Sequence, residues 1–358
     1  MWIIAVREFR NYLKNPIYWL GMLIVIGMAF QQLAPYLKLY EAAPQESAAG
    51  QSREEMLTDG DIMDGYVPST KAQQLEAACL EVRRQLLEEA GYTEEEAEAV
   101  YRDLSGRDFS DEEFDAYLQE QYGFYNGYWI MQENALHPGT AEEIDAYIQS
   151  KMQEHPYSYY FARKFADFSG LFLGFFSSVL LALLYARDTK GDLYELLHTK
   201  PIAARAYIAG KAAGGMLGVL LVLGVLNVVF GILCQAAASK GGFLFRCLDL
   251  PAASLCYIVP NLLMIVSVYT VVSLLFKSPY PAMPLLFVYQ VYSNMGSRDA
   301  NGRYGYFGRP LAIMVRFPGR LLDTVPPPMA VYNQIFLLVA SALLLLLSVW
   351  IWKRRRVY

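Results

Sequence analysis

The chain has few residues of the kinds that bind metal ions or attack substrates. It contains three histidines and four cysteines in 358 residues, and it has no H-E-x-x-H, no pair of C-x-x-C motifs and no G-x-S-x-G. Neither a metal site nor the nucleophile turn of α/β-hydrolases is therefore predicted. The phosphate-binding motif G-x-x-x-x-G-K-[ST] is absent too, since Gly210-Lys211 is followed by alanine. The sequence predicts no catalytic residue and no cofactor, so any ATP-dependent work requires another chain to hydrolyse ATP.

Charged residues are also scarce, at 18% of the chain, whereas 55% of the residues are hydrophobic and the mean hydropathy is +0.22. A membrane-crossing helix needs about 20 apolar residues. The chain has six apolar runs of roughly this length, at 17–37, 165–186, 212–235, 252–276, 281–295 and 332–352. Lipid offers the backbone no hydrogen-bond partners, so each run is expected to be a helix. Run 281–295 is short and holds Pro281 and Pro284, so we expect it to be tilted or broken.

Basic residues beside these runs predict their orientation. Arg7, Arg10 and Lys14 precede the first run, and a Lys-Arg-Arg-Arg sequence at 353–356 follows the last. We therefore expect both termini to be cytoplasmic, in a bacterial plasma membrane. Segment 296–331 would then lie outside, although it carries Arg298, Arg303, Arg309, Arg316 and Arg320. Two partners for these arginines are open: the acidic outer domain described next, or lipid phosphates.

Residues 40–163 are expected to form a small helical domain outside the membrane. They contain 27 acidic and 8 basic residues, against 8 acidic and 22 basic in the rest of the chain. Helices are predicted by an apolar face within 71–90, before Gly91, and by capping boxes, in which Ser or Thr precedes Glu by three residues. The boxes are Thr93–Glu96, Ser110–Glu113 and Thr140–Glu143. Cys79 has no partner within this domain; Cys234, Cys247 and Cys256 either pair or act as small apolar fillers.

Charge and proline interrupt the apolar chain at residues 185–211, YARDTKGDLYELLHTKPIAARAYIAGK, which hold eight charged residues. Leu193, Leu196 and Leu197 fall on one side of a short helix that Pro201 would end. Acidic and basic residues share its other faces, which favours docking in a protein groove. Binding to the inner leaflet is the alternative.

This segment resembles the intracellular coupling segment of type 2 ABC transporter permeases. The resemblance rests on the pattern R-D-x-x-G-x-x-x-E-L-L-x-x-x-P-I-x-x-x-x-Y-x-x-G-K. The residues that it assigns to ATPase coupling, with Leu193 from the apolar side of the helix, are Arg187, Asp188, Gly191, Leu193, Glu195, Leu196, Leu197 and Pro201. The N-terminal WIIAVREFRNYLKNP is similar to the interfacial elbow helix of that family, with Arg7, Phe9, Arg10 and Lys14 as its contact residues.

The resemblance implies a fold and a function. The fold would be all-α and polytopic, with an elbow helix at 1–15, a first span at 16–39, the acidic extracellular domain at 40–163 and five further spans in 164–358. A coupling helix at 187–205 and a re-entrant-like outer loop at 296–331 would lie within that last part. The chain would be the permease subunit of an exporter. It would work with two ATPase subunits that bind ATP and Mg²⁺, and with a second permease chain, identical or related. No nucleic acid is expected as a partner.

Polar residues within the apolar runs are candidates for lining a pathway, because buried polar groups in a bilayer seldom face lipid. They are Asn227, Asn261, Ser267, Thr270, Tyr289, Gln290 and Tyr292. No acidic or basic residue lies in the middle of a run, so the expected cargo is amphipathic or hydrophobic: a peptide, an antibiotic or other drug, or a lipid-like molecule. Gly210, Gly214 and Gly218 predict close helix contact, within one chain rather than across a dimer.

Two other classes stay open. A membrane sensor or immunity protein would bind a ligand through the acidic domain without transport, and it would have no ATPase partner. A membrane enzyme would need paired carboxylates or histidines within the spans, and the sequence has none there.

Overall fold

The computed structural model describes residues 1–41, 66–188, 202–298, 304–305 and 308–354. The chain in these ranges is helical apart from two two-stranded sheets, short connections and one longer irregular segment that precedes the last helix. It divides into two compact units, which are described separately. Unit 1 comprises Met1–Glu41 and Met152–Tyr358, and unit 2 comprises Ala42–Lys151.

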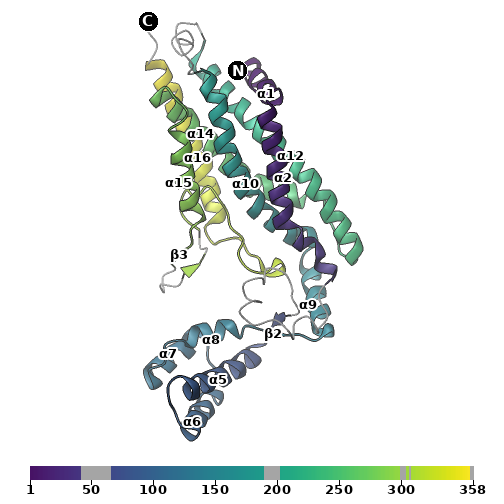
Figure 1. Ribbon diagram of the computed structural model, residues 1–358, viewed down its shortest axis with the longest axis vertical. Helices are drawn as coiled ribbons and strands as arrows, with labels where there is room; N and C mark the ends of the chain where they lie inside the picture. The colour runs from purple at the N-terminus through teal and green to yellow at the C-terminus, as the bar shows by residue number, and fades with distance from the viewer. Residues whose placement is uncertain (42–65, 189–201, 299–303, 306–307, 355–358) are drawn as a thin grey trace. The chain divides into compact units, whose positions relative to one another are not determined.

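Unit 1 contains the long apolar helices (Figure 1). Its elements are α1 (Trp2–Leu13), α2 (Pro16–Leu33), the 3-10 turn η1 (Pro35–Glu41), α10 (Tyr157–Asp188), α12 (Ala204–Gly241), α13 (Asp249–Tyr257), α14 (Val259–Phe276), α15 (Ala282–Asn294), β3 (Ser297–Arg298), β4 (Tyr304–Gly305), η2 (Leu321–Asp323) and α16 (Ala330–Arg354). The described residues include five stretches long and apolar enough to cross a membrane, at Pro16–Leu33, Tyr157–Leu183, Ala204–Gly241, Asp249–Phe276 and Ala330–Arg354. The prediction of an all-helical chain with membrane character is confirmed.

The predicted fifth span, at 281–295, is not among these five. Its counterpart, α15, has 13 residues, which is about 20 Å of helix at 1.5 Å per residue, whereas the hydrocarbon core is about 30 Å thick. Pro279 and Pro281 precede the helix and Met295 after it is extended. The second span also differs from its expected bounds: the helix that contains it starts at Tyr157 rather than near residue 165, because the polar first turns continue directly into the apolar run.

Helices α14 and α16 run in the same direction. The Ser341 hydroxyl approaches the Met264 sulfur at 3.6 Å, and further along both helices Val271 and Leu274 pack in one cluster with Ile351 and Trp352. The chain must therefore return along the bundle between Phe276 and Ala330. Helix α15 and the irregular segment after it make that return.

Apolar side chains cover much of the outer surface of unit 1. They are exposed along α2, α15 and α16, among them Leu23, Phe287, Val288, Leu343 and Leu346. A soluble monomer rarely exposes continuous apolar faces of this kind. Contact with lipid or with another apolar chain accounts for them.

Unit 2 is a helical unit with one small sheet. Its elements are β1 (Tyr66–Pro68), α5 (Lys71–Glu88), α6 (Glu94–Ser105), α7 (Asp111–Tyr122), α8 (Gly127–Glu133), β2 (Leu136–Pro138) and most of α9 (Ala141–Glu154). The three predicted capping boxes are confirmed: each Glu side chain accepts from the backbone N–H of the capping residue, and each capping hydroxyl accepts from the Glu N–H. A fourth box, Thr70–Gln73, starts α5. The sheet and α8 were not predicted.

The core of unit 2 follows the predicted apolar faces. Leu75, Cys79, Val82 and Leu86 of α5 are buried against Ala97, Val100 and Leu104 of α6 and Phe114 and Leu118 of α7. Gly91 has a positive φ of 71°, a backbone conformation that glycine adopts at little cost, and it reverses the chain after α5. All four cysteines are free, so Cys234, Cys247 and Cys256 are not paired.

Candidate functional site

The predicted coupling residues fall at a boundary of the described structure. Gly191, Leu193, Glu195, Leu196, Leu197 and Pro201 lie outside the described residues, and Arg187 and Asp188 form the last turn of α10. Their roles stay predictions. The described ends of this segment are α10, which leads into it, and α12, which begins at Ala204 after it.

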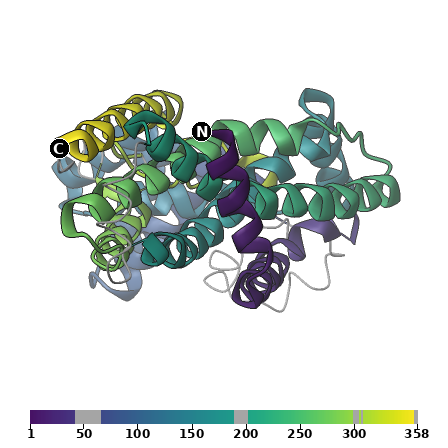
Figure 2. The ribbon, with the colours of Figure 1, turned by 90° about the horizontal axis from the view of Figure 1, so that it is seen from above.

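The start of α12 packs tightly on the N-terminal helix α1 through three glycines (Figure 2). A Cβ atom on Gly210 would lie 2.8 Å from the Ile4 Cβ. One on Gly214 would lie 2.6 Å from the Glu8 Cβ, and one on Gly218 would lie 2.8 Å from Cδ2 of Tyr12. Only glycine allows the two backbones to approach this closely. The prediction that the glycine series packs within one chain is confirmed.

A buried ion pair joins the same two helices. The Lys211 Nζ lies 3.1 Å from Oε1 of Glu8, with the Lys211 side chain 1% exposed and that of Glu8 11% exposed. The ring of Tyr185 on α10 lies 5.7 Å from the Lys211 ammonium, and the Tyr185 hydroxyl is 2.5 Å from that of Thr270 on α14. Four helices thus meet around one charge pair. Ionisable groups buried in an apolar bundle are costly, and they are retained where they serve a function.

Sequence reasoning found the exposed face of α1 but not this contact. Arg7, Arg10 and Lys14 are exposed, and Phe9 is half-buried, while Ala5, Glu8 and Tyr12 form the buried face. Their spacing of three and four residues is that of one helix face. The signal in the sequence was Glu8, the one acidic residue of α1, which lies among basic residues and therefore suggests a basic partner elsewhere in the chain.

The first turns of α12 also contact α16 and α2. The ring of Tyr207 stacks on that of Trp352 near the end of α16, with centroids 4.1 Å apart. In addition, the Tyr18 hydroxyl of α2 donates to the Gly218 carbonyl at 2.7 Å. The helix that follows the predicted coupling segment is therefore held by α1, α2 and α16.

The predicted pathway residues do not gather around one cavity. Asn227 donates to Ser254 at 2.9 Å and joins α12 to α13, whereas Gln290 donates to the Gly174 carbonyl at 2.8 Å and to Ser178 at 2.7 Å and joins α15 to α10. Ser267 and Asn261 donate to carbonyls one turn back in or before α14. The buried residues of this set could line a pathway between two permease chains only after the helices rearrange. Tyr292 is 43% exposed and could line such a pathway without a rearrangement.

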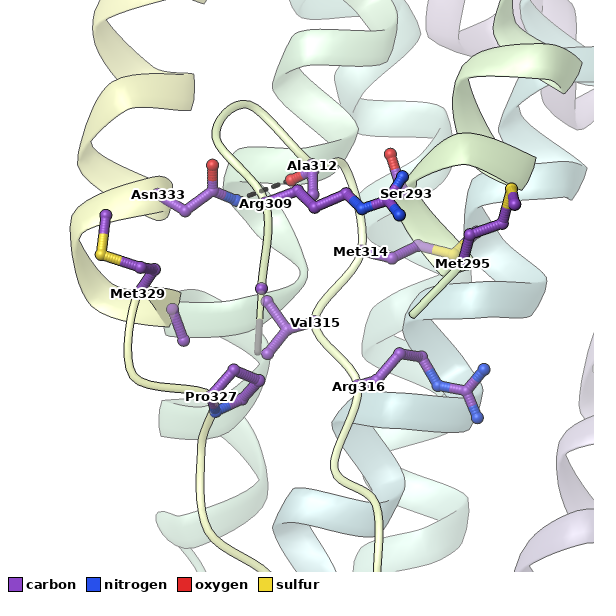
Figure 3. Close-up of a pocket in the computed structure, with 12 residues that line it drawn as sticks. Ser293, Met295, Arg309, Ala312, Met314, Val315, Arg316, Pro327, Met329 and Asn333 are labelled. Atoms are coloured by element: carbon purple, nitrogen blue, oxygen red, sulfur yellow. Dashed lines mark hydrogen bonds between the residues drawn. The ribbon is translucent and has the colours of Figure 1, made fainter. Parts of the chain in front are cut away.

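A small cavity lies where the irregular segment after α15 returns toward α16 (Figure 3). Its volume is about 30 Å³, room for a water molecule or two. Its lining includes Ser293, Arg309, Met314, Arg316 and Asn333. The Asn333 amide donates to the Ala312 carbonyl at 2.7 Å, and Tyr289 donates to the Leu311 carbonyl. Side chains from both helices thus bind the irregular backbone.

Buried charged side chains of α10 also bind the backbone of this irregular segment. Lys164 is 1% exposed, and its ammonium donates to the carbonyls of Phe317 at 3.0 Å and Gly319 at 2.6 Å. The Asp167 carboxylate accepts from the Phe317 N–H at 2.9 Å and pairs with Arg316 at 2.5 Å. Irregular backbone is tolerated at membrane depth only where protein groups bind it. We call Lys164, Asp167 and Arg316 the α10 charge cluster.

Arg309 and Arg316 of this segment have partners within unit 1. Arg316 pairs with Asp167, and Arg309 donates to the carbonyls of Gly296 and Tyr292. The side chains of Arg298 and Arg303 lie outside the described residues. The predicted contact of these arginines with acidic groups or with phosphates stays a prediction.

Helix α10 connects the two charged regions. Asp167 and Tyr185 are 18 residues apart, about 27 Å along a helix, and residues 168–184 contain no charged side chain. This spacing is close to the thickness of a hydrocarbon core, about 30 Å. The α10 charge cluster and the Glu8–Lys211 pair are therefore separated along α10 by about the thickness of a hydrocarbon core.

Within the described ranges, no group of three or more His, Cys, Asp or Glu side chains is arranged to hold a metal ion. Comparison with protein-family models, with curated proteins and with solved structures gives no match for the chain.

Proposed function

We propose that the chain is the permease subunit of an ATP-driven exporter that moves an amphipathic or hydrophobic cargo, such as a peptide or a lipid-like molecule, out of the cell. The observation that carries the proposal is the charged segment 187–205 between two membrane-length helices, together with the firm attachment of the helix that follows it. A flexible linker would need no such attachment.

The proposed mechanism uses the segment as a lever. A partner ATPase that binds the Leu193, Leu196 and Leu197 side would push on the segment when its subunits close on ATP and Mg²⁺. The push would reach α12 through Pro201 and Ala204. Because Glu8, Lys211 and the three glycines hold α1 and α12 together, the two helices would move as one body and alter a pathway shared with a second permease chain.

Purification from native membranes tests the partner. We expect an ATPase to co-purify with the full chain in a mild detergent. The Glu195→Ala variant should retain the partner and its ATP turnover but lose transport of a fluorescent hydrophobic substrate in proteoliposomes, because Glu195 lies at the predicted contact. The matched control is Glu154→Ala, at an exposed acidic residue of α9, which should transport normally.

Absence of an ATPase from every preparation would contradict the exporter and favour the sensor. If the ATPase is present but Glu195→Ala transports normally, the assignment of the coupling segment is wrong, while the exporter itself stands.

A further inference from the structure

Unit 2 brings together a serine, a histidine and a glutamate that are far apart in the sequence. Ser69 directly follows β1, His137 is the central residue of β2, and Glu143 lies in the first turn of α9. Strands β1 and β2 are antiparallel, with Val67 opposite His137. The Ser69 N–H donates to the Ala135 carbonyl at 2.9 Å and extends this pairing, so the backbone fixes Ser69 beside the histidine.

The three side chains are arranged in series. The Ser69 Oγ lies 3.2 Å from Nδ1 of His137, and Nε2 of His137 lies 4.0 Å from Oε1 of Glu143. The Nε2 atom is buried and makes no hydrogen bond to the described residues. A hydroxyl within hydrogen-bond reach of an imidazole, with a third group on the far side of the ring, is the arrangement of an activated nucleophile.

The glutamate is held in its charged form by its own helix. Its other oxygen, Oε2, accepts from the Thr140 backbone N–H at 2.8 Å. This bond and the Thr140 hydroxyl hold the pKa of Glu143 below its ordinary value. An ionised Glu143 favours a proton on Nε2, which leaves Nδ1 free to accept the proton of Ser69.

A pocket of about 320 Å³ opens beside the serine and the histidine. Its polar lining is Ser69, Gln73, Asn134 and His137, and its remaining walls are Tyr66, Ala77, Leu136 and Pro138. The volume and the apolar walls suit a short acyl chain. Helix α5 begins at Lys71, two residues after Ser69, and the first N–H groups of a helix have no carbonyl partner within it. Two of these groups, the N–H of Thr70 and that of Gln73, are used in the capping box, which leaves the N–H groups of Lys71 and Ala72 to bind an oxygen that becomes negative.

We propose that Ser69, His137 and Glu143 form a hydrolytic site for esters of small, apolar carboxylic acids. The Ser69 Oγ bonds to the ester carbon while its proton passes to Nδ1 of His137. The carbon–oxygen bond to the alcohol then breaks, and the alcohol leaves with that proton. Water repeats the sequence: its oxygen bonds to the acyl carbon, its proton passes to Nδ1, and Ser69 leaves with the proton as the acid is released. Glu143 is a positioning residue that stabilises the imidazolium.

This activity is independent of the proposed export, because it uses residues of unit 2 alone and needs no ATPase. The Ser69–His137 contact could instead be a structural hydrogen bond that joins β2 to the residue before α5. A structural hydrogen bond does not make the Ser69 oxygen reactive, so the reactivity of Ser69 distinguishes a hydrolytic site from a structural contact.

The test is labelling of the purified full-length chain by a fluorophosphonate probe, which bonds to an activated serine oxygen and releases fluoride. We expect one label per chain, at Ser69, and slow hydrolysis of p-nitrophenyl butyrate that Ser69→Ala abolishes. His137→Ala should label at least about 100-fold more slowly, since a general base contributes 10² or more. The control Ser150→Ala, at an exposed serine of α9, should label like the natural chain.

Glu143→Gln tests the positioning role with the helix intact, because glutamine also completes a capping box. We expect labelling about tenfold slower with unchanged thermal unfolding, because the neutral amide does not stabilise the imidazolium. The proposal is overturned if the natural chain does not label under conditions that label an authentic serine esterase. It is also overturned if the label is found on another residue, or if His137→Ala and the natural chain label equally fast.

Discussion

At the scale of single residues, the Glu8–Lys211 pair both stabilises unit 1 and joins the two helices that are proposed to move together. Each charge is buried and has the other beside it at 3.1 Å. Removal of one partner leaves the other charge without compensation in an apolar site. A neutral pair of similar shape avoids that cost.

We therefore predict that Lys211→Met destabilises the chain by about 3–5 kcal/mol, whereas the double variant Glu8→Gln with Lys211→Met lies within about 1 kcal/mol of the natural chain. Thermal unfolding in detergent measures both. The Asn11 amide, which donates to Glu8 at 3.4 Å, can donate equally to the glutamine. If the two variants are equally destabilised, the residues act separately and the pair does not join α1 to α12.

The glycines of α12 allow a matched comparison. A Cβ on Gly214 would lie 2.6 Å from the Glu8 Cβ, but one on Gly224 would meet nothing within 4 Å. We expect Gly214→Ala to destabilise by about 1–3 kcal/mol, because α1 must shift. Gly224→Ala should be neutral or stabilising by up to about 1 kcal/mol, because alanine is the better helix former. Equal effects in thermal unfolding would exclude the close packing described above.

These residue contacts show how far sequence reasoning reaches. The spacing of Gly210, Gly214 and Gly218 predicted a close helix contact, since small residues one turn apart have few other uses in a membrane helix. The identity of the other helix was not readable, because Glu8 and Lys211 are about 200 positions apart and no local pattern records their pairing. The same holds for Ser69 and His137, which only the β1–β2 register brings together.

At the scale of elements, the irregular segment after α15 depends on α10. Asp167 binds both the Phe317 N–H and the Arg316 guanidinium. Hydrogen bonds to a charged group contribute about 1.5–3 kcal/mol each. Loss of this carboxylate should let the segment leave its buried position more often.

We predict faster maleimide labelling of a cysteine at Ile313, 1% exposed in the natural chain, when Asp167 is changed to Ala. The increase should be about tenfold or more, given that 1.4 kcal/mol is a factor of ten. Cys247 and Cys256 are exposed and are first replaced by serine. Asp167→Asn keeps an acceptor for the Phe317 N–H and should give a smaller increase. Equal labelling in all three chains would contradict an anchor at Asp167.

The helices of unit 2 are stabilised by carboxylates that act as caps or accept side-chain bonds. The hydroxyls of Tyr117 and Tyr122 donate to Asp103 at 2.7 and 2.9 Å and lower its pKa below the ordinary value of 3.8. The Ser110 backbone N–H and hydroxyl lower the pKa of Glu113 below 4.5. A carboxyl with a lowered pKa in the folded chain stabilises it above the ordinary pKa. That contribution is lost as the pH falls through the folded value.

Acid should therefore destabilise unit 2 below about pH 4.5, the ordinary value for Glu113. The expected result is a fall in its unfolding temperature between pH 5 and pH 2, followed by near-UV circular dichroism of the tyrosines in the full chain. Asp103→Asn should make this fall shallower, because the titrating group is gone. Asp145→Asn, at an exposed carboxyl of α9, should leave the slope unchanged. An identical slope in Asp103→Asn would contradict the role given to the two tyrosines.

Prediction of elements succeeded where one local pattern decides the structure. The capping boxes and apolar faces of α6, α7 and α9 are local, and so are the long apolar runs. The strands β1 and β2 have three residues each, too few to show an alternating pattern. The irregular segment 308–324 is held by side chains of α10, α15 and α16, so its course depends on packing that no short window contains.

At the scale of the whole molecule, the number of crossings decides on which sides the termini lie. Five stretches of the described chain are long enough to span, and an odd number of crossings would place the termini on opposite sides. The parallel course of α14 and α16 requires a return between them. In Figure 1 the start of α1 and the end of α16 lie at the same end of unit 1. We therefore infer six crossings, with the short α15 and the segment 308–324 together completing the return.

The resulting prediction is that both termini are labelled from the same side. Single cysteines at Trp2, which is exposed, and at Tyr358, in a chain whose natural cysteines are replaced by serine, should react with a membrane-impermeant maleimide only after the cytoplasmic face is opened. A third cysteine at Ser150, in the acidic unit, should react in intact cells. Reaction of the C-terminal cysteine alone in intact cells would mean that α15 does not complete a crossing. Reaction of the N-terminal cysteine in intact cells would place the attachment of α12 to α1 at the outer membrane face, where no cytoplasmic ATPase could act on it, and the exporter would fail with the topology.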